Sequence, residues 1–287
     1  MGMVRTPERP APRPGHPPRR VVERTEDAAW AAAELAAGAV VGAAFGNFYA
    51  LVSRPDEATV RAVNLLKGRP AAQTGSITAP PASVADVWDL TRLPSGLSAA
   101  AAREIVDAFL GLGPFGFRGP AQPLVPAHLT ALDHDVVTAQ LIAPGHICPS
   151  HDFLDRAQVA AGTPFLYVTS ANRSRHATGA ADSPAHWRAA GLAADFGSHP
   201  AFRLLEHTDE AAARRRHPWF LPASTSVLAL HRMVIPPDHN RPHLVLERHG
   251  SLPAATISSV LDGLGFGLVL APAASTRLTP RVYASTA

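Results

Sequence analysis

The sequence predicts an α/β fold in which a twisted mixed sheet with flanking helices forms a single domain over residues 25–265. Helix-like and strand-like segments alternate along this range without an internal repeat, as is typical of layered α/β domains. Hydrophobic residues make up 46% of the 287 residues, which is enough for a sizeable core. No run of about 18 apolar residues occurs, so we expect no membrane span.

The first elements are marked by the residues at their ends. Thr25 is the expected N-cap of a helix that Gly38 ends, since threonine caps helices and glycine terminates them. The apolar segment 39–45 follows as a buried strand. Asp56 is the expected N-cap of a second helix, and Gly68 is its expected terminator.

The later elements follow the same logic of capping residues and apolar periodicity. They are a short strand at 76–79, helices opened by Ser83 and Ser98, inner strands at 136–143 and 164–171 with a helix at 152–162 between them, a helix at 183–197, strands at 223–230 and 243–248, and a closing helix at 254–265.

The two ends of the chain lack such patterns. Residues 1–24 are rich in proline and arginine and have no signal-peptide core, which predicts a disordered basic tail. Residues 266–287 are expected to form a C-terminal tail. The single Cys148 excludes an internal disulfide framework and favours a cytoplasmic location. The formal net charge of +3 is compatible with phosphate-bearing partners without requiring them.

Lys67 is the only lysine in a chain whose other basic side chains are arginines. In such a composition, a lysine that needs only positive charge is easily replaced by arginine. An ammonium is a compact point charge, whereas a guanidinium is planar and larger. We therefore interpret Lys67, at the C-terminus of the second helix, as a candidate phosphate-binding residue; chance survival of one lysine is the alternative.

Three other segments are weaker candidates. The glycine pattern at 111–116 follows a helix instead of a strand, which argues against a dinucleotide site. The segment 146–151 has two histidines and a cysteine at a spacing that fits no standard zinc site, so no metal site is predicted there. The basic segment 213–219 is expected to be a solvated loop, with a phosphate or RNA contact as the alternative.

Four short motifs occur in one order along the chain: Lys67-Gly68-Arg69-Pro70, Ser170-Ala171-Asn172, Ser224-Thr225-Ser226 and Arg248-His249-Gly250. In this order they resemble the YrdC-like threonylcarbamoyl-AMP synthase family. Residues 38–51 also resemble the opening strand and turn of that family, and residues 113–117 resemble part of another of its segments. The resemblance covers residues 40–260.

The resemblance implies a deep basic cavity in which ATP, bicarbonate and L-threonine are joined into threonylcarbamoyl-AMP, with Mg²⁺ and with release of pyrophosphate. A partner then transfers the threonylcarbamoyl group to tRNA. By similarity, Lys67 and Arg69 would be catalytic cations that grip the triphosphate. The implied ATP site would be completed by Ser170, Asn172, Ser224 and Arg248.

The sequence departs from the family on the side that would hold the amino acid and bicarbonate. Phe45 and Asn47 stand where the family has threonines, and Tyr49 follows in the matching turn. Thr78 stands where a histidine is common, and Ile147 where an arginine is expected. Losing an arginine removes the natural partner of an amino-acid carboxylate. We therefore expect an amine substrate other than threonine in this pocket.

Three hypotheses follow from the sequence. The first is an ATP-dependent carbamoyl-adenylate synthase acting on threonine or another amine. The second is a non-catalytic YrdC-like protein that binds a nucleotide or double-stranded RNA. The third is an unrelated α/β protein in which the motifs are only turns. Formation of an adenylate separates the first from the second, and a cavity joining Lys67 with Asn172 separates both from the third.

Overall fold

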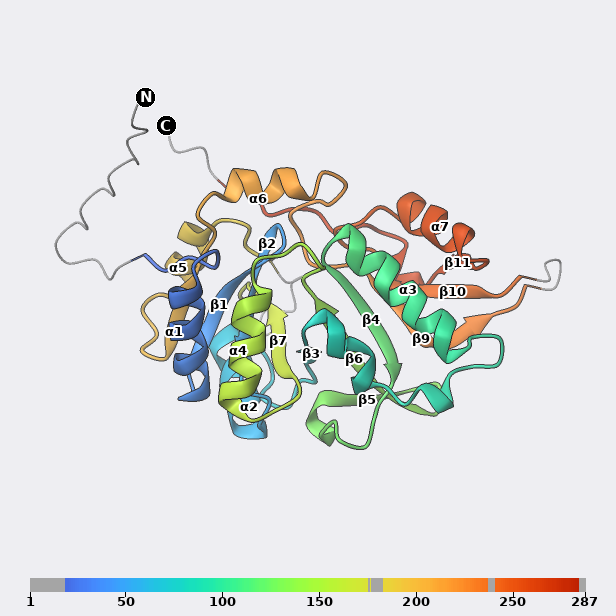
Figure 1. The fold of residues 1–287 in the computed structure, drawn as a ribbon, viewed down its shortest axis with the longest axis horizontal. Helices are drawn as coiled ribbons and strands as arrows, with labels where there is room; N and C mark the ends of the chain where they lie inside the picture. The colour runs from blue at the N-terminus through green and yellow to red at the C-terminus, as the bar shows by residue number, and fades with distance from the viewer. Residues whose placement is uncertain (1–18, 175, 177–182, 237–240, 284–287) are drawn as a thin grey trace, which may run out of the picture.

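The computed structural model describes residues 19–174, 176, 183–236 and 241–283, in which helices flank one mixed sheet (Figure 1). The helices are α1 (Thr25–Ala36), α2 (Glu57–Lys67), α3 (Ala99–Leu112), α4 (His151–Ala161), α5 (Ala189–Phe196), α6 (Glu210–Arg216) and α7 (Ala254–Gly263). The strands are β1 (Val40–Phe45), β2 (Phe48–Ser53), β3 (Ser76–Thr78), β4 (Phe115–Pro120), β5 (Thr130–Asp133), β6 (Val136–Ala143), β7 (Leu166–Ser170), β8 (Phe202–Leu205), β9 (Val227–Val234), β10 (His243–Arg248) and β11 (Gly267–Leu270).

The sheet has the order β11-β10-β9-β4-β6-β3-β7-β2-β1-β8, and β5 pairs with β6 beside this path. Antiparallel pairs such as β1 with β2 occur together with parallel pairs such as β4 with β9. The predicted mixed α/β fold is therefore confirmed. Strand β3 pairs with both β6 and β7 in the middle of the sheet. Three strands that are far apart in the sequence therefore lie side by side and build one surface.

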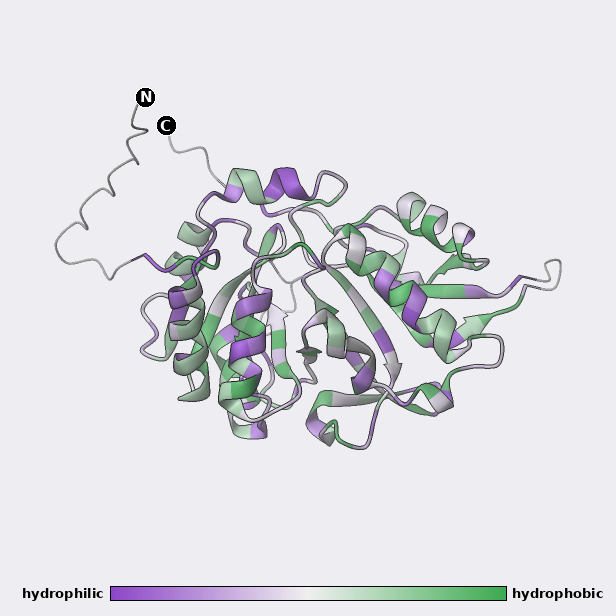
Figure 2. Ribbon diagram, viewed as in Figure 1, coloured by the Kyte–Doolittle hydropathy of each residue, from purple (hydrophilic) through white to green (hydrophobic). Residues whose placement is uncertain are grey.

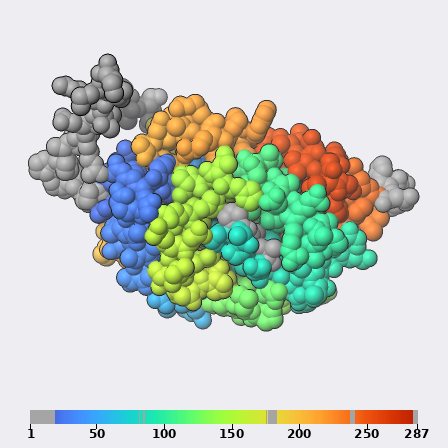
Figure 3. Space-filling model, viewed as in Figure 1, coloured from blue at the N-terminus to red at the C-terminus, as the bar shows by residue number. Residues whose placement is uncertain are grey.

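Helices α1, α4 and α3 cover the face of the sheet that is turned to the viewer (Figures 1 and 3). Helices α1 and α4 pack closely against each other, and the sides of α4 and α6 that face outward carry polar residues (Figure 2). The core beneath includes a phenylalanine cluster in which the rings of Phe109 and Phe115 stack at 4.4 Å. No helix of the described residues is long and apolar enough to cross a membrane.

Helix α2 has the predicted ends. The Asp56 carboxylate accepts a hydrogen bond from the backbone N–H of Thr59, and Gly68 ends the helix with φ of 76°. A positive φ is readily adopted only by glycine, so Gly68 turns the chain directly after Lys67. This turn places Lys67 at the helix end, as its position in the sequence predicts.

Other elements differ from expectation. Ser83 lies within a 3₁₀ helix (Pro81–Val87) instead of opening an α-helix. The helix expected at 183–197 begins only at Ala189, because the residues before it are bound to the C-terminal segment described below. Strand β4 includes the end of the glycine pattern at 111–116, for which no strand was predicted.

The domain also extends beyond the predicted boundaries. Val21 and Val22 are buried, and the Val22 N–H donates to the Glu206 carbonyl at 2.8 Å, so the ordered chain begins before residue 25. Residues 1–18 of the predicted tail lie outside the described residues. At the other end, β11 pairs in parallel with β10, so part of the predicted C-terminal tail is sheet.

Candidate functional site

A cavity of about 180 Å³ lies over the middle of the sheet, where residues from distant parts of the chain meet. Strands β2, β3, β6 and β7 contribute to its lining, together with the loop after α2 and the segments around Ser224 and Arg248. The polar lining residues are Arg69, Gln73, Thr74, Ser76, Gln140, Thr169, Ser170, Ser224, Thr225 and Arg248. Among the described residues, no carboxylate lines this cavity.

One side of the cavity, here called the cationic wall, is formed by Arg69, Thr169 and Ser170 with Lys67 behind them. Lys67 is fully buried, and its ammonium donates to Thr169 Oγ1 at 2.9 Å and to the Ser170 carbonyl oxygen. Its Nζ also lies 3.4 Å from Asn172 Oδ1. Lys67 and Asn172 do not themselves line the cavity. The lysine affects the cavity indirectly, through its hydrogen bonds to the lining residues Thr169 and Ser170.

The two arginines of the cavity come from opposite ends of the chain. The Arg69 guanidinium donates to Thr169 Oγ1 at 2.9 Å, and that of Arg248 donates to the Thr225 carbonyl at 2.7 Å. Burial, together with the nearby guanidiniums of Arg118 and Arg69, lowers the pKa of Arg248 to about 10. Like charges held together in a partly dry cavity favour an anionic ligand.

The motifs around Ser224 and Arg248 are joined by their backbones. The Ser251 N–H donates to the Ser224 carbonyl at 2.9 Å, and the Gly250 N–H donates to Ser226 Oγ at 3.1 Å. A Cβ atom on Gly250 would lie 2.3 Å from the Ser224 carbonyl oxygen, so only glycine permits this approach. The approach fixes Ser224 and Arg248 at the same rim of the cavity.

The opposite side, here called the amide wall, was not predicted from the sequence. It is formed by Ser76 of β3 and Gln140 of β6, whose amide nitrogen donates to Ser76 Oγ at 2.7 Å. The Gln140 amide oxygen accepts from Arg118 at 2.9 Å, directly across the β4–β6 pair. Gln140 and Ile142 are two residues apart in β6 and therefore point to the same face of the sheet. This period of two is a signal that could have identified the wall.

The residues predicted for the amino-acid side do not line this cavity. Phe45 and Thr78 are fully buried, and the Asn47 amide donates to the Phe220 carbonyl at 3.0 Å. The Tyr49 hydroxyl contacts Glu210 at 2.9 Å, and burial together with that carboxylate raises the pKa of Tyr49. Ile147 is 53% exposed, and the residues that β6 presents to the cavity are Gln140 and Ile142. Their role as a substrate pocket remains a prediction.

The last described segment of the chain, residues 275–283, crosses between the motif loops; we call it the C-terminal strap. The Leu278 N–H donates to the His249 carbonyl at 2.8 Å, and Arg277 donates to the Gly250 carbonyl at 3.1 Å. The strap is thus bound to the loop that follows Arg248.

Further along, the strap is bound to the segment before α5. The Trp187 indole donates to the Arg281 carbonyl at 2.7 Å, and the Tyr283 hydroxyl lies 2.9 Å from His186 Nδ1. The His186 N–H in turn donates to the Ala171 carbonyl at 2.8 Å. The strap therefore connects the loop after Arg248 with the loop that holds Asn172.

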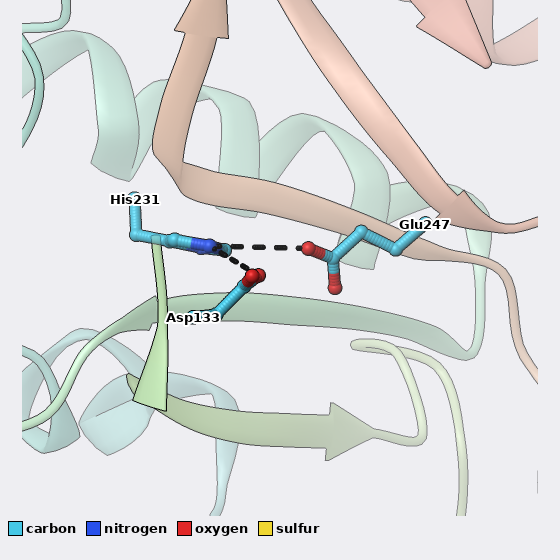
Figure 4. Close-up of side chains that lie close together, drawn as sticks. All are labelled: Asp133, His231 and Glu247. Carbon is cyan, nitrogen blue, oxygen red and sulfur yellow. Dashed lines mark hydrogen bonds and ion pairs between the residues drawn. The ribbon is translucent and has the colours of Figure 1, made fainter. Parts of the chain in front are cut away.

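A second polar cluster is formed by Asp133, His231 and Glu247 (Figure 4). His231 Nε2 is 2.8 Å from the Asp133 carboxylate and 3.9 Å from that of Glu247, and the three potential ligand atoms lie within 4.8 Å of one another. However, Glu247 also accepts from Arg118 at 2.8 Å and from Arg232 at 3.0 Å. Two guanidiniums already neutralise the two carboxylates, so the cluster acts as an ion network bracing β4, β5, β9 and β10.

The weaker sequence candidates have structural roles. Cys148 is buried, lies 2.8 Å from Ser150 Oγ and accepts from the Gly46 N–H at 3.2 Å. The basic segment at 214–216 forms the last turn of α6, where Arg214 lies over the Trp187 ring at 4.6 Å. The cation–π contact binds α6 to the segment before α5.

Several solved structures share this fold. A double alanine variant of P. abyssi Sua5 is 19% identical with a TM-score of 0.61, over 87% of this chain and 63% of that chain. P. abyssi Sua5 in complex with L-threonine is 18% identical with a TM-score of 0.60, over 90% of this chain and 66% of that chain. The chain therefore spans just under two thirds of the Sua5 length.

E. coli YciO is 13% identical with a TM-score of 0.50, over 76% of this chain and 87% of that chain. Full-length HypF in a phosphate- and nucleotide-bound form is 12% identical with a TM-score of 0.50, over 77% of this chain and 28% of that chain. No protein-family model and no curated protein sequence matches the chain. These likenesses confirm the predicted YrdC-like fold.

Proposed function

We propose that this YrdC-like protein binds ATP through the cavity and forms a carbamoyl-adenylate from ATP, bicarbonate and an amine. The observation that carries the proposal is a cavity lined by two arginines and several hydroxyls, with no carboxylate among its described lining residues. Arginine and hydroxyl donors in a partly dry site are suited to phosphate oxygens, because charge-assisted hydrogen bonds are the strongest available there.

The size of the cavity limits what part of ATP it holds. At about 180 Å³ it is smaller than the roughly 300 Å³ at the lower end for sites that enclose a whole drug-sized ligand. The phosphates would therefore lie between Arg69 and Arg248, and the nucleoside would extend outward past Ser170 and Asn172. Lys67 would act from behind by fixing the oxygens of Thr169 and Ser170.

The chemistry requires positioning more than a protein nucleophile. The amine and bicarbonate combine to a carbamate with loss of water, and a carbamate oxygen then attacks the α-phosphorus. The bond between the α-phosphorus and its bridging oxygen breaks, and pyrophosphate leaves. The guanidiniums of Arg69 and Arg248 would stabilise the charge that develops on the phosphate oxygens.

Mg²⁺ would enter with the nucleotide. This ion usually keeps several waters and binds substrate phosphates with one or two carboxylates. The described lining offers hydroxyls but no carboxylate, so Ser224 and Thr225 are the candidates to approach the hydrated ion. When bound, Mg²⁺ neutralises part of the charge on the leaving pyrophosphate.

Two of the similar structures support this ligand set. The Sua5 structure is a complex with L-threonine, and the HypF structure is a phosphate- and nucleotide-bound form. At this identity they support an amino acid or amine and a nucleotide as ligands to be tested on this chain. Because the sequence departs from the family pattern at Phe45 and Ile147, we propose an amine other than threonine, with transfer of the carbamoyl group to tRNA as the downstream step.

The test is pyrophosphate release by the purified protein with ATP, bicarbonate, Mg²⁺ and a panel of amino acids and amines. We expect release that depends on one amine and on bicarbonate. Arg248→Met should lower the rate about tenfold or more, since it removes a charge-assisted bond of about 1.5–3 kcal/mol. Arg61→Met, on the exposed side of α2, is the matched control. Absence of amine-dependent release across the panel would reject the synthase.

A non-catalytic nucleotide- or double-stranded-RNA-binding protein is the second candidate. It is favoured by the Lys67 ammonium, which donates to protein oxygens, and by the absence of the five predicted amino-acid-side residues from the lining. ATP binding measured by calorimetry without any adenylate product would support nucleotide binding alone. Binding of a duplex RNA that ATP does not displace would instead support an RNA-binding role.

A further inference from the structure

Helix α2 carries a second fully buried polar side chain besides Lys67. Asn64 lies one turn before the lysine, on the face of the helix that Val60 and Val63 also bury. Asparagine is a poor residue for a helix interior, and an amide is costly to bury without hydrogen-bond partners. A leucine would suit this face of α2 better, so the reason for an asparagine has to lie in the bonds that it makes.

The Asn64 amide uses both of its hydrogens and its oxygen. Its nitrogen donates to the Gln73 carbonyl at 2.8 Å and to the Ala71 carbonyl at 3.1 Å. Its oxygen accepts from the Tyr167 hydroxyl at 3.1 Å. Backbone carbonyls can only accept, so the amide has one orientation that satisfies all three neighbours. Burial raises the pKa of Tyr167, so its hydroxyl keeps the hydrogen that it donates.

The two bonded carbonyls belong to the segment 68–75, here called the α2–β3 loop. The backbone of Asn64 also holds the start of this loop, because its carbonyl accepts from the Arg69 N–H at 2.9 Å. Four residues of the loop line the cavity, namely Arg69, Gln73, Thr74 and Gly75. One residue outside the cavity lining therefore fixes the segment that supplies much of the lining.

Tyr167 supports the same loop from the sheet. Its side chain is fully buried, and a Cβ atom on Gly75 would lie 2.0 Å from its Cε2 atom, so the ring lies directly against the loop backbone. Tyr167 is also the partner of Ile77 in the β3–β7 pair, just beyond the end of the loop. The loop is thus held from α2 by Asn64 and from β7 by Tyr167.

We infer that Asn64 is a positioning residue, which acts through the α2–β3 loop to hold Arg69, Gln73 and Thr74 in place for a phosphate chain. The inference rests on the proposed function in taking the polyphosphate of a nucleotide as the ligand of these groups. A loop that must become ordered on binding loses affinity, whereas donors fixed in advance do not carry that cost. The buried amide fixes them before the ligand arrives.

The test measures binding of inorganic tripolyphosphate with Mg²⁺ to the full chain by calorimetry, because this probe has the phosphate chain without nucleoside or amine. Asn64→Leu removes both amide donors at similar size, and we expect at least about tenfold weaker binding. The control Gln122→Leu removes an amide that donates to the Trp88 carbonyl at 3.1 Å, outside the cavity lining. It should change the affinity less than about twofold. Equal losses in the two variants, or no binding by the native protein, would overturn the inference.

Tyr167→Phe provides a milder variant in case Asn64→Leu does not fold, which its thermal unfolding midpoint will show. It removes only the hydroxyl that orients the Asn64 amide, and we expect about threefold or greater loss of tripolyphosphate affinity. Unchanged affinity in Tyr167→Phe would contradict the role of Asn64.

Kinetics with the active amine separate positioning from a general loss of folded protein. In Asn64→Leu the KM for ATP should rise about tenfold, and the KM for the amine should change less than about twofold. A purely structural role would lower kcat and leave both KM values unchanged. Tripolyphosphate binding by the native protein without amine-dependent pyrophosphate release rejects the proposed function alone. Amine-dependent release with unchanged tripolyphosphate affinity in both variants rejects the role of Asn64 alone.

Discussion

The two walls of the cavity are held in place by different means. The cationic wall is fixed by Lys67, which is fully buried and donates to neutral oxygens of β7. The amide wall is fixed by Arg118 and a network whose Asp133 and Arg232 side chains remain 31% and 27% exposed. Buried hydrogen bonds are little affected by salt, whereas partly exposed ion pairs are screened. We therefore expect the structure of the cationic wall to change little with salt concentration, and that of the amide wall to depend on it.

The largest expected effect comes from removing the buried cation. Lys67→Met removes the charge-assisted hydrogen bonds that the ammonium donates to the Ser170 carbonyl and to Thr169 Oγ1, at about 1.5–3 kcal/mol for each bond. We expect the free energy of unfolding, measured by urea denaturation, to fall by about 3 kcal/mol. Arg61→Met on the same helix removes only an exposed i,i+4 pair and should cost less than about 1 kcal/mol. Similar losses in both variants would mean that the lysine has no special place in this wall.

Lys67→Arg tests whether the compact ammonium matters. The site is fully buried, so a larger planar guanidinium must displace Thr169 or Ser170. We expect about 1–3 kcal/mol of lost stability from overpacking, and weaker ATP binding by a similar amount in calorimetric titration. Equal ATP affinity of the two proteins would mean that this single lysine was retained by chance.

Tyr283→Phe tests whether the C-terminal strap supports the loop of Asn172 without supporting the amide wall. It removes the hydroxyl that lies 2.9 Å from His186 Nδ1, and His186 is bound to the loop of Asn172. We expect a loss of about 1 kcal/mol in unfolding free energy. Hydrogen exchange should rise at Ala171 and Asn172 but not at Gln140. Faster exchange on both walls would show that the strap supports the whole cavity.

The smallest expected effect concerns acid. Burial would raise the pKa of Asp133, but the hydrogen bond from His231 and the nearby charges hold it below its usual value of 3.8. A carboxyl with a lowered folded-state pKa contributes stability above about pH 4, and this is lost as the pH falls through the folded value. The unfolding free energy of the native protein should therefore fall between about pH 5 and pH 3, and in Asp133→Asn this fall should be smaller by about 1 kcal/mol or less. Parallel curves for the two proteins would place Asp133 outside the brace.

The sequence predicts one wall better than the other for a physical reason. Residues of the cationic wall lie at element ends such as Gly68 and Ser170, where capping and turn chemistry leave local signals. Ser76 and Gln140 lie in strands, and only the pairing of β3, β6 and β7 brings them to the cavity. The family resemblance placed Ile147 at the substrate side, and the structure shows it exposed in the segment after β6.

The strap is synthesised after all the residues of the two walls, and this order matters for the cavity. Domains generally begin to fold from the N-terminus as the chain emerges from the ribosome. Every wall residue up to Arg248 can emerge before residues 277–283, yet these residues join the two motif loops. A nascent chain would thus possess an assembled sheet with an unsecured cavity until its last described segment is made. We therefore predict that the ligand binding proposed for this cavity requires the strap, and that shortened translation products fold without becoming competent to bind.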